Sequence, residues 1–458
     1  MSRPVTNYLI RNSKLLQTLD SSQQELKVPE LVTEQQQVKG LLRAFLALRH
    51  RNFRLFWSGQ LISLIGTWMQ TTGQAWLVLE LTHSAWLLGV VSALQFLPVL
   101  LLSLFGGVLA DRVPKRKVLL FTQSFAALQA FVLWTLVATG EVQLWHVLIL
   151  ASLLGLTNSV DMPTRQAFVV EMVGREDLPN AIALNSSMFN MARILGPGLG
   201  GLIIAWLGLA PLFLLNALSF LPVILGLALI DLSQLYAQAK RIVGQNDTPK
   251  QSTLQSLREG LVYVVRTPSI LLIICIVGAV ALFGMNFNVL MPLFATDVLH
   301  VGAAGFGFIS SAIGLGALFS ALWLAWSNTR PSIHRLLLST IVFCVLEIFF
   351  AISHWYLLSL VLIAGAGFAS IAFSATANTI AQTVAPDYLR GRVMSVYMMV
   401  FVGSAPFGSL FIGGLAHLFG APVALFTGAG IGLIAAVIGW LLRAPAEKSL
   451  AETTRTIA

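Results

Sequence analysis

Four ionisable side chains in long apolar stretches of the sequence are the ones most able to do chemistry there. They are Asp161, Arg165, Arg193 and Glu347. A charge at the centre of a membrane costs about 2.5–3.5 kcal/mol even on a lenient insertion scale, so such residues pair with one another or serve a function. Asp161 and Arg193 are therefore candidates for an ion pair or a proton relay, and Glu347 for a proton carrier. The alternative for Asp161 and Arg193 is an interfacial position with loop charges as partners.

A second group of charges interrupts the apolar sequence after Gly107. The group consists of Asp111, Arg112, Lys115, Arg116 and Lys117. One carboxylate and four cations this close together cannot lie in hydrocarbon, so they indicate a tight loop between two spanning helices. Short loops rich in Lys and Arg stay on the cytoplasmic side of a membrane. The loop is therefore expected in the cytoplasm.

A third stretch, Gly196-Pro197-Gly198-Leu199-Gly200-Gly201, concentrates small residues around one proline. Small residues let membrane helices approach each other closely. Proline removes a backbone donor and bends a helix. The stretch predicts either a functional bend or ordinary close packing of helices.

The composition identifies the elements that must position these residues. The chain has 458 residues, of which 57% are hydrophobic and 10% charged, with a mean hydropathy of +0.82. Soluble domains carry about 25% charged residues, and a spanning helix needs about 20 mostly apolar residues. We predict an all-α membrane protein with twelve transmembrane helices, at residues 55–79, 84–110, 118–139, 143–164, 183–206, 210–230, 269–295, 304–326, 335–353, 355–377, 392–416 and 422–443.

A polar stretch in the middle of the chain separates six spans from six. The predicted organisation is a cytoplasmic N-terminal arm with a surface helix, a six-helix bundle, a cytoplasmic linker, a second six-helix bundle and a cytoplasmic tail, at 1–54, 55–230, 231–268, 269–443 and 444–458. Within the arm, residues 38–54 interleave leucines with arginines. This pattern is typical of an amphipathic surface helix, or it extends the first span.

The distribution of Lys and Arg predicts the topology. All 28 of these residues fall in the arm, the linker, the tail, the loops on one side or the inner part of a helix, so the positive-inside rule places both termini in the cytoplasm. The polar first 37 residues have no apolar core of a signal peptide. Cys275 and Cys344 lie far apart in apolar segments, and the scattered histidines have no metal spacing, so neither a disulfide framework nor a metal site is expected.

The charged loop has the pattern G-x-L-A-D-R-x-x-x-R-K, which resembles the loop 2–3 signature (motif A) of the major facilitator superfamily. It departs from that signature at Pro114, where a glycine is usual. In the superfamily this loop latches two bundles together when the transporter faces outward. The resemblance implies a conformational switch made by Gly107, Asp111, Arg112 and Arg116, with partners at Arg390 and Arg392. For the last two, a role in topology alone is the alternative.

The Gly-Pro stretch resembles the G-P-x-x-G-G core of the antiporter signature (motif C), which marks exporters in the superfamily. Gly196, Pro197, Gly200 and Gly201 carry that match, while Ala183 and Ala192 stand where upstream glycines are usual. The arginine of many proton antiporters (motif B) is also missing, and Ala151 stands in its place.

Further stretches resemble the drug-efflux branch of the superfamily that includes the enterobactin exporter and macrolide-efflux proteins. They are 52–57, 161–166 and 180–186, and the resemblance covers about residues 50–443. Polar positions that can line a central cavity are Gln70, Gln74, Gln95, Asn190, Asn286, Asn288 and Asn378. Trp68, Trp76 and Phe287 can supply aromatic surface to it.

These features predict a secondary active transporter of the bacterial inner membrane. It would export an amphipathic small molecule, a drug or a siderophore, by alternating access coupled to protons. The sequence has no G-x-x-x-x-G-K-[ST] motif and no catalytic constellation, so we expect no enzyme, no cofactor and no nucleic-acid partner. The expected protein is a monomer in the lipid bilayer. The alternatives are a lysophospholipid or lipid flippase, and a non-transporting membrane sensor, against which the intact Asp111 loop argues.

Overall fold

The computed structural model describes residues 40–236, 253–327 and 332–457. Helices make up almost all of these ranges, and they contain no strand. Residues from Ala47 onward form one compact unit, to which the account below refers.

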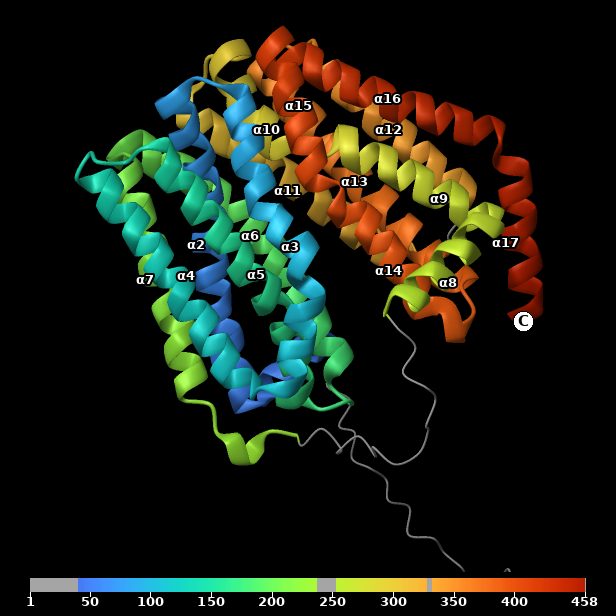
Figure 1. The fold of residues 1–458 in the computed structure, drawn as a ribbon, viewed down its shortest axis with the longest axis horizontal. Coiled ribbons are helices and arrows are strands. Elements are labelled where there is room, and N and C mark those ends of the chain that lie inside the picture. Colours follow the sequence, from blue (N-terminus) through green and yellow to red (C-terminus); the bar gives the residue numbers. More distant parts are fainter. Residues whose placement is uncertain (1–39, 237–252, 328–331, 458) are drawn as a thin grey trace, which may run out of the picture. The chain divides into compact units, whose positions relative to one another are not determined.

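The first group of helices corresponds to the N-terminal half. It consists of α2 (Arg51–Thr82), α3 (Ala85–Arg112), α4 (Lys115–Ala138), α5 (Leu144–Val173), α6 (Leu178–Leu207) and α7 (Leu209–Ala228). Within it α2 packs on α6 and α7, α3 on α5, and α4 on α5 and α7 (Figure 1). Prolines inside α3, α5, α6 and α7 are tolerated, as is usual in membrane helices.

The second group corresponds to the C-terminal half. It consists of α9 (Pro268–Ala279), η3 (Val280–Gly284), α10 (Phe287–Leu293), η4 (Phe294–Val298), α11 (Gly302–Ser327), α12 (Ile333–Ala351), α13 (Tyr356–Val384), α14 (Asp387–Gly403), α15 (Ala405–Phe419) and α16 (Ala421–Leu441). Here α13 packs on α11 and α12, and α16 packs on α12 and α15.

Eleven membrane-spanning candidates, by length and composition, occur in the described residues. The predicted first span, 55–79, lies within α2, which is not among the eleven. The physical reason is the polarity of α2, which carries Gln60, Gln70, Thr71, Thr72 and Gln74 on one helix. Together with α2, the eleven candidates give the predicted all-α membrane protein with two sets of six spans, so the fold class is confirmed.

The seventh predicted span, 269–295, lies within one membrane-spanning candidate, Pro268–Val298, but it is not one regular α-helix. Pro268–Val298 is broken into α9, the π-helical turn η3, α10 and the π-helical turn η4. The Met285 amide donates to the Val280 carbonyl at 3.0 Å, five residues back, and the Asn286 side chain donates to the Leu282 carbonyl at 2.9 Å. Pro292 lacks an amide hydrogen, which weakens the α-helical ladder further. We call this discontinuous segment helix seven.

The eleventh span is also interrupted, at Ser404 between α14 and α15. Pro406 lies in the first turn of α15, a position where its missing amide hydrogen costs little. The backbone at Ser404 stays in the right-handed helical region, so Asp387–Phe419 remains one membrane-spanning candidate.

Two short helices lie at one end of the C-terminal helices, next to the starts of α9 and α14, and we call this end of the protein the linker side. They are α8 (Thr253–Arg266) and α17 (Arg443–Ile457). α8 packs on α14 and α17 packs on α9, where the Ser449 and Ser269 hydroxyls are 3.2 Å apart. A helical segment, η1 (Gly40–Arg49), precedes α2. The chain is extended at His50, with φ −73° and ψ 113°, so η1 is not a continuation of α2; residues 38 and 39 lie outside the described residues.

The junction between η1 and α2 is tied to the start of α6. The buried Asp177 carboxylate lies 2.9 Å from Arg49 Nη2 and 2.5 Å from His50 Nε2, and the Ala47 amide donates to Asn180 Oδ1 at 2.8 Å. Asp177→Ala should lower the free energy of unfolding by about 1–3 kcal/mol, since it removes the acceptor of charged donors.

The measurement is thermal or denaturant unfolding in detergent, with Asp387→Ala as the control. Asp387 pairs with Arg390, but its side chain is 89% exposed, so its removal should change stability by less than about 0.5 kcal/mol. Equal changes in the two variants would contradict the anchoring role of Asp177.

Candidate functional site

The two halves meet most closely on the side away from the linker, which we call the far side. The contacts are made by α6 with α11 and by α3 with α15. A Cβ atom added at Gly201 would lie 2.6 Å from the Ala303 carbonyl, and one at Gly89 would lie 2.4 Å from the Ser409 carbonyl. Backbone packing this tight is possible only for glycine. In this structure the halves are therefore closed on the far side.

An aromatic pair strengthens this closure. Trp76 of α2 and Phe306 of α11 are stacked, with ring centroids 6.0 Å apart and planes at 20°. Both side chains are buried, and the Trp76 indole donates to Glu80 Oε1 at 2.6 Å. The pair joins one half of the protein to the other.

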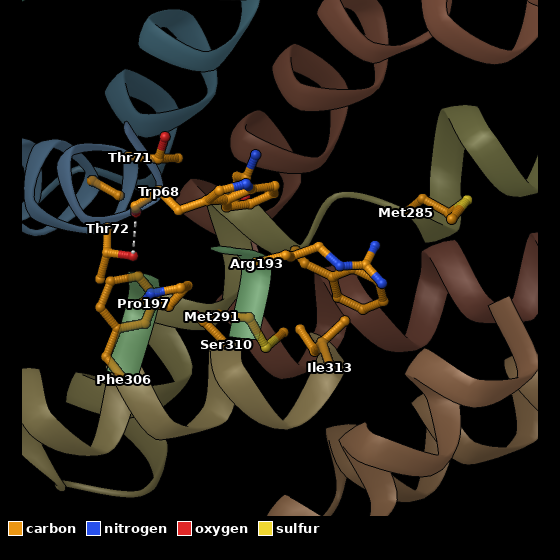
Figure 2. Close-up of a pocket in the computed structure, with 13 residues that line it drawn as sticks. Trp68, Thr71, Thr72, Arg193, Pro197, Met285, Met291, Phe306, Ser310 and Ile313 are labelled. Atoms are coloured by element: carbon orange, nitrogen blue, oxygen red, sulfur yellow. Dashed lines mark hydrogen bonds between the residues drawn. The ribbon is translucent and has the colours of Figure 1, made fainter. Parts of the chain in front are cut away.

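A cavity of about 190 Å³ lies next to this pair, between the two halves (Figure 2). Four elements supply its wall: α2, α6, helix seven and α11. Its lining residues are Trp68, Thr71, Thr72, Ala75, Arg193, Pro197, Met285, Phe287, Asn288, Met291, Phe306, Ser310 and Ile313. We call it the central cavity.

Helical spacing explains how α2 and α11 present these residues. Trp68, Thr71, Thr72 and Ala75 are three, four and seven residues apart, so they share one face of α2. The lining residues of α11 follow the same spacing. Helix seven contributes from its break onward, where Met285 and the start of α10 face the cavity. The interruption of helix seven thus shapes the wall.

Arg193 is the only charged side chain in this wall. Its Nε atom is buried and has no hydrogen-bond partner, and its Nη2 atom makes one long contact of 3.4 Å with Asn190 Oδ1. No ion pair of Arg193 occurs in the part of the chain that the structure describes. A guanidinium presents several donors in a fixed planar fork, so an unpaired one in a cavity is suited to bind an anionic group.

A second cavity of about 530 Å³ adjoins the first and is lined by α5 and α6. Its wall combines apolar residues with the amides or hydroxyl of Gln166, Asn185, Ser186 and Asn190. Phe189 from this wall touches Trp68 of the central cavity edge to face, at 5.7 Å. Polar groups therefore continue from the central cavity toward the linker-side end of α6.

Asp161 is placed away from the central cavity. Its carboxylate accepts hydrogen bonds from Thr122 Oγ1 at 2.7 Å and Gln123 Nε2 at 2.8 Å, both of α4. It also pairs with Arg165 one turn along α5. The structure therefore joins Asp161 to Arg165 and not to Arg193. Glu347 of α12 is fully buried and lies outside the lining of both cavities.

The polar residues expected to line a cavity divide into two groups. Asn288 lines the central cavity and Asn190 the second one. Gln70 instead lies inside the N-terminal bundle, where it donates to Gln129 at 3.0 Å and accepts from Asn216 at 2.5 Å. The remaining four lie outside both linings: Gln74, Gln95, Asn286 and Asn378.

The Gly-Pro stretch of α6 has two packing faces. Added Cβ atoms at Gly196 and Gly200 would meet Trp68 and Met69 of α2, within the same bundle. Gly201 meets α11 of the other bundle, and Pro197 lines the central cavity. One motif therefore serves both bundle assembly and the contact between bundles.

Of the expected switch residues, the structure describes the side-chain surroundings of all but Asp111. The side chain of Asp111 lies outside the described residues. Gly107 has open space around it and Arg112 is exposed. Arg116 donates to the Leu227 and Ala228 carbonyls at 2.7 and 2.6 Å, at the end of α7.

The two arginines near the start of α14 have other partners. Arg390 pairs with Asp387 at 2.6 Å on its own helix and donates to the Gln382 carbonyl at 3.0 Å. Arg392 pairs with Glu259 of α8. In this conformation Arg392, one of the two expected partners of the charged loop, is therefore paired with α8.

Sequence reasoning missed much of the cavity wall. Thr71, Thr72, Ser310, Met285, Met291 and Phe306 were not expected there. Thr71 and Thr72 could have been predicted, since their spacing puts them on the same helix face as Trp68, which was expected at the cavity. The position of Met285 in the wall could not have been predicted, because it results from the break in helix seven.

Comparison with known proteins gives one family and several relatives. Residues 43–457 match the family described as transmembrane secretion effector. The enterobactin exporter EntS of Shigella boydii serotype 4 is 28% identical over 411 residues, covering 88% of this chain and 93% of that protein. The staphyloferrin A transporter of Staphylococcus aureus is 24% identical over 369 residues, covering 80% and 90%.

Solved structures with the same fold include distant transporters. The nucleoside transporter NupG matches 88% of this chain and 99% of its own, with a TM-score of 0.64 and 15% identity. The peptide transporter PepTSo matches 87% and 99%, with a TM-score of 0.67 and 12% identity. At such identities the likeness shows the fold alone.

Proposed function

Because the chain belongs to the transmembrane secretion effector family of major facilitator transporters, we propose that it exports an anionic, amphipathic small molecule of the siderophore class in exchange for protons. Two bundles rocking about a central site would move the cargo. The chain acts as a transporter and not as an enzyme, and works as a monomer.

Arg193 is the observation that carries this proposal. Arg193 is half-buried, with its Nε atom fully buried; a cation that loses water without gaining a counter-charge is costly, and an anionic cargo in the central cavity would offset that cost. Trp68, Phe287 and Phe306 supply apolar and aromatic surface in the same wall. This combination fits an acidic aromatic molecule better than a cationic drug. Two relatives with names that refer to siderophores agree with the proposal.

The orientation follows from the charges. The linker side carries Arg49, Lys115, Arg116, Arg390 and Arg392, which the positive-inside rule assigns to the cytoplasm of a bacterial inner membrane. The conformation closed on the far side is then the one that loads cargo from the cytoplasm.

The test is uptake of enterobactin into inside-out vesicles with an imposed proton gradient, with a cationic dye measured in parallel. We expect enterobactin uptake that depends on the gradient, and no uptake of the dye. Uptake of the dye alone would overturn the anionic cargo. Enterobactin uptake that ignores the gradient would overturn proton exchange, and transfer of labelled lysophospholipid instead would favour a flippase.

A further inference from the structure

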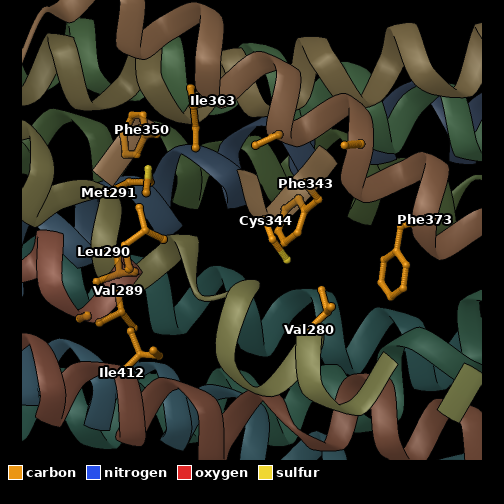
Figure 3. Close-up of a cluster of buried hydrophobic side chains, with 14 of the residues drawn as sticks. Val280, Val289, Leu290, Met291, Phe343, Cys344, Phe350, Ile363, Phe373 and Ile412 are labelled. Atoms are coloured by element: carbon orange, nitrogen blue, oxygen red, sulfur yellow. The ribbon is translucent and has the colours of Figure 1, made fainter. Parts of the chain in front are cut away.

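The carboxyl group of Glu347 is isolated inside the C-terminal bundle. The residue is 0% exposed, and neither oxygen has a hydrogen-bond partner among the residues that the structure describes. Its Oε2 atom lies 3.3 Å from the position that a Cβ atom would take at Gly284 of η3. Phe343 lies beside the same Gly284 position, and Val280, Phe343 and Cys344 belong to one apolar cluster (Figure 3).

Among the described residues, no cation lies on α9, η3, α13 or α16, and the charged residue of η4, whose Phe294 contacts Phe350 of α12, is the exposed Asp297. α16 contains no titratable residue, α13 contains only Tyr356, and α9 with η3 contains only Cys275. On α12 itself, Cys344 is one turn away, while His334 and Arg335 stand at the linker-side end. α17 touches that same end, with Arg443, Glu447 and Lys448.

An ionised carboxylate in this place would lack both a counter-charge and a hydrogen-bond donor. Burying such a group costs several kcal/mol, and a buried acid avoids that cost by keeping its proton. We therefore expect Glu347 to keep its proton while the far side is closed. Ionisation requires the carboxyl group to reach water or a donor, so the surrounding helices must move.

The element beside Glu347 is also the element that shapes the central cavity. η3 is a π-helical turn, and such turns often mark functional sites. Immediately after it, Met285, Phe287 and Asn288 line the central cavity. Phe343 of α12 also contacts Phe287 edge to face, with centroids 6.2 Å apart. Two contacts thus link the surroundings of Glu347 to the cavity wall.

We propose that Glu347 is the proton-binding site of this transporter, and that its proton sets the bend of helix seven and so the shape of the central cavity. The inference rests on the proposed function and extends it by naming the coupling residue and its route. In an exchanger, cargo and proton occupy the protein in turn. Cargo binding at the central cavity should therefore accompany release of the Glu347 proton.

Enterobactin binding to the purified protein at several pH values tests the coupling. In the natural protein affinity should rise with pH, by at most about tenfold per pH unit for one proton, and binding should release protons into weakly buffered solution. Glu347→Gln imitates the neutral form, so its affinity should not depend on pH and no protons should be released. Glu347→Asp should restore the dependence in part, and Cys344→Ala, one turn away, should keep it in full.

Infrared spectroscopy tests the same residue without any cargo. The natural protein in lipid should show a protonated carboxyl band that disappears at high pH, and Glu347→Gln should lack that band. A protonated band without enterobactin binding would contradict the proposed cargo but leave Glu347 as the proton-binding site. If Glu347→Gln keeps both proton release and proton-driven uptake, Glu347 is not the coupling residue, while the proposed export function is retained.

Discussion

Arg193→Gln should weaken enterobactin binding by roughly tenfold to a hundredfold. Hydrogen bonds to a charged group contribute about 1.5–3 kcal/mol, and each 1.4 kcal/mol corresponds to about a factor of ten in affinity. Arg193→Lys should have an intermediate affinity, because it keeps the charge but loses the planar fork of donors. Binding to the purified protein, measured by titration at fixed pH, gives the comparison.

Arg193→Gln should also make the cargo-free protein more stable, although it weakens binding of the cargo. The buried Nε atom of the half-buried Arg193 has no partner among the described residues, and removing a partly desolvated charge without a counter-charge relieves its desolvation cost. Arg193→Gln is therefore expected to raise the unfolding temperature while it lowers affinity, a trade-off found at binding sites.

Arg175→Gln is the matched control, since Arg175 is exposed in the loop before α6. This control should change neither the affinity for enterobactin nor the unfolding temperature. A lower unfolding temperature in Arg193→Gln would show that Arg193 is a structural residue. Unchanged affinity would show that cargo binds without it.

The sequence was sufficient for those features that depend on polarity along the chain. The twelve spans follow from apolar runs, and Arg193 stood out because a cation in such a run is rare. The resemblance of the charged loop and the Gly-Pro stretch pointed to the correct superfamily. These are local signals, so one sequence was enough to read them.

Features that depend on packing between distant helices could not be predicted in this way. Gln70 and Asn288 are both amides in spanning segments, yet one joins a network inside a bundle and the other lines the cavity. Their own sequence neighbourhoods do not distinguish them. The π-helical turns of helix seven likewise have no simple residue pattern, and they decide which residues reach the cavity.

Gly201→Leu should trap the protein with its far side open and stop transport. The side chain would have to occupy the space where a single Cβ already lies 2.6 Å from the Ala303 carbonyl and 2.9 Å from Gly307 Cα. Overpacking of this kind costs about 1–3 kcal/mol, which corresponds to a shift of about fivefold to 150-fold in a two-state equilibrium. Distances between spin labels on α2 and α11 at the far side would report the shift.

Gly430→Leu is the control for the size of the side chain, because nothing lies within 4 Å of a Cβ atom at Gly430 of α16. Gly196→Ala separates the two faces of the motif. Its Cβ would meet Trp68 within the same bundle, so it should lower stability and leave the far-side equilibrium nearly unchanged.

Normal transport by Gly201→Leu would mean that the tight α6–α11 contact is not needed in the cycle. Equal loss of stability in Gly201→Leu and Gly196→Ala would mean that the glycines serve only to assemble helices. The contrast between these neighbouring positions therefore decides whether the motif acts in conformational change or in packing alone.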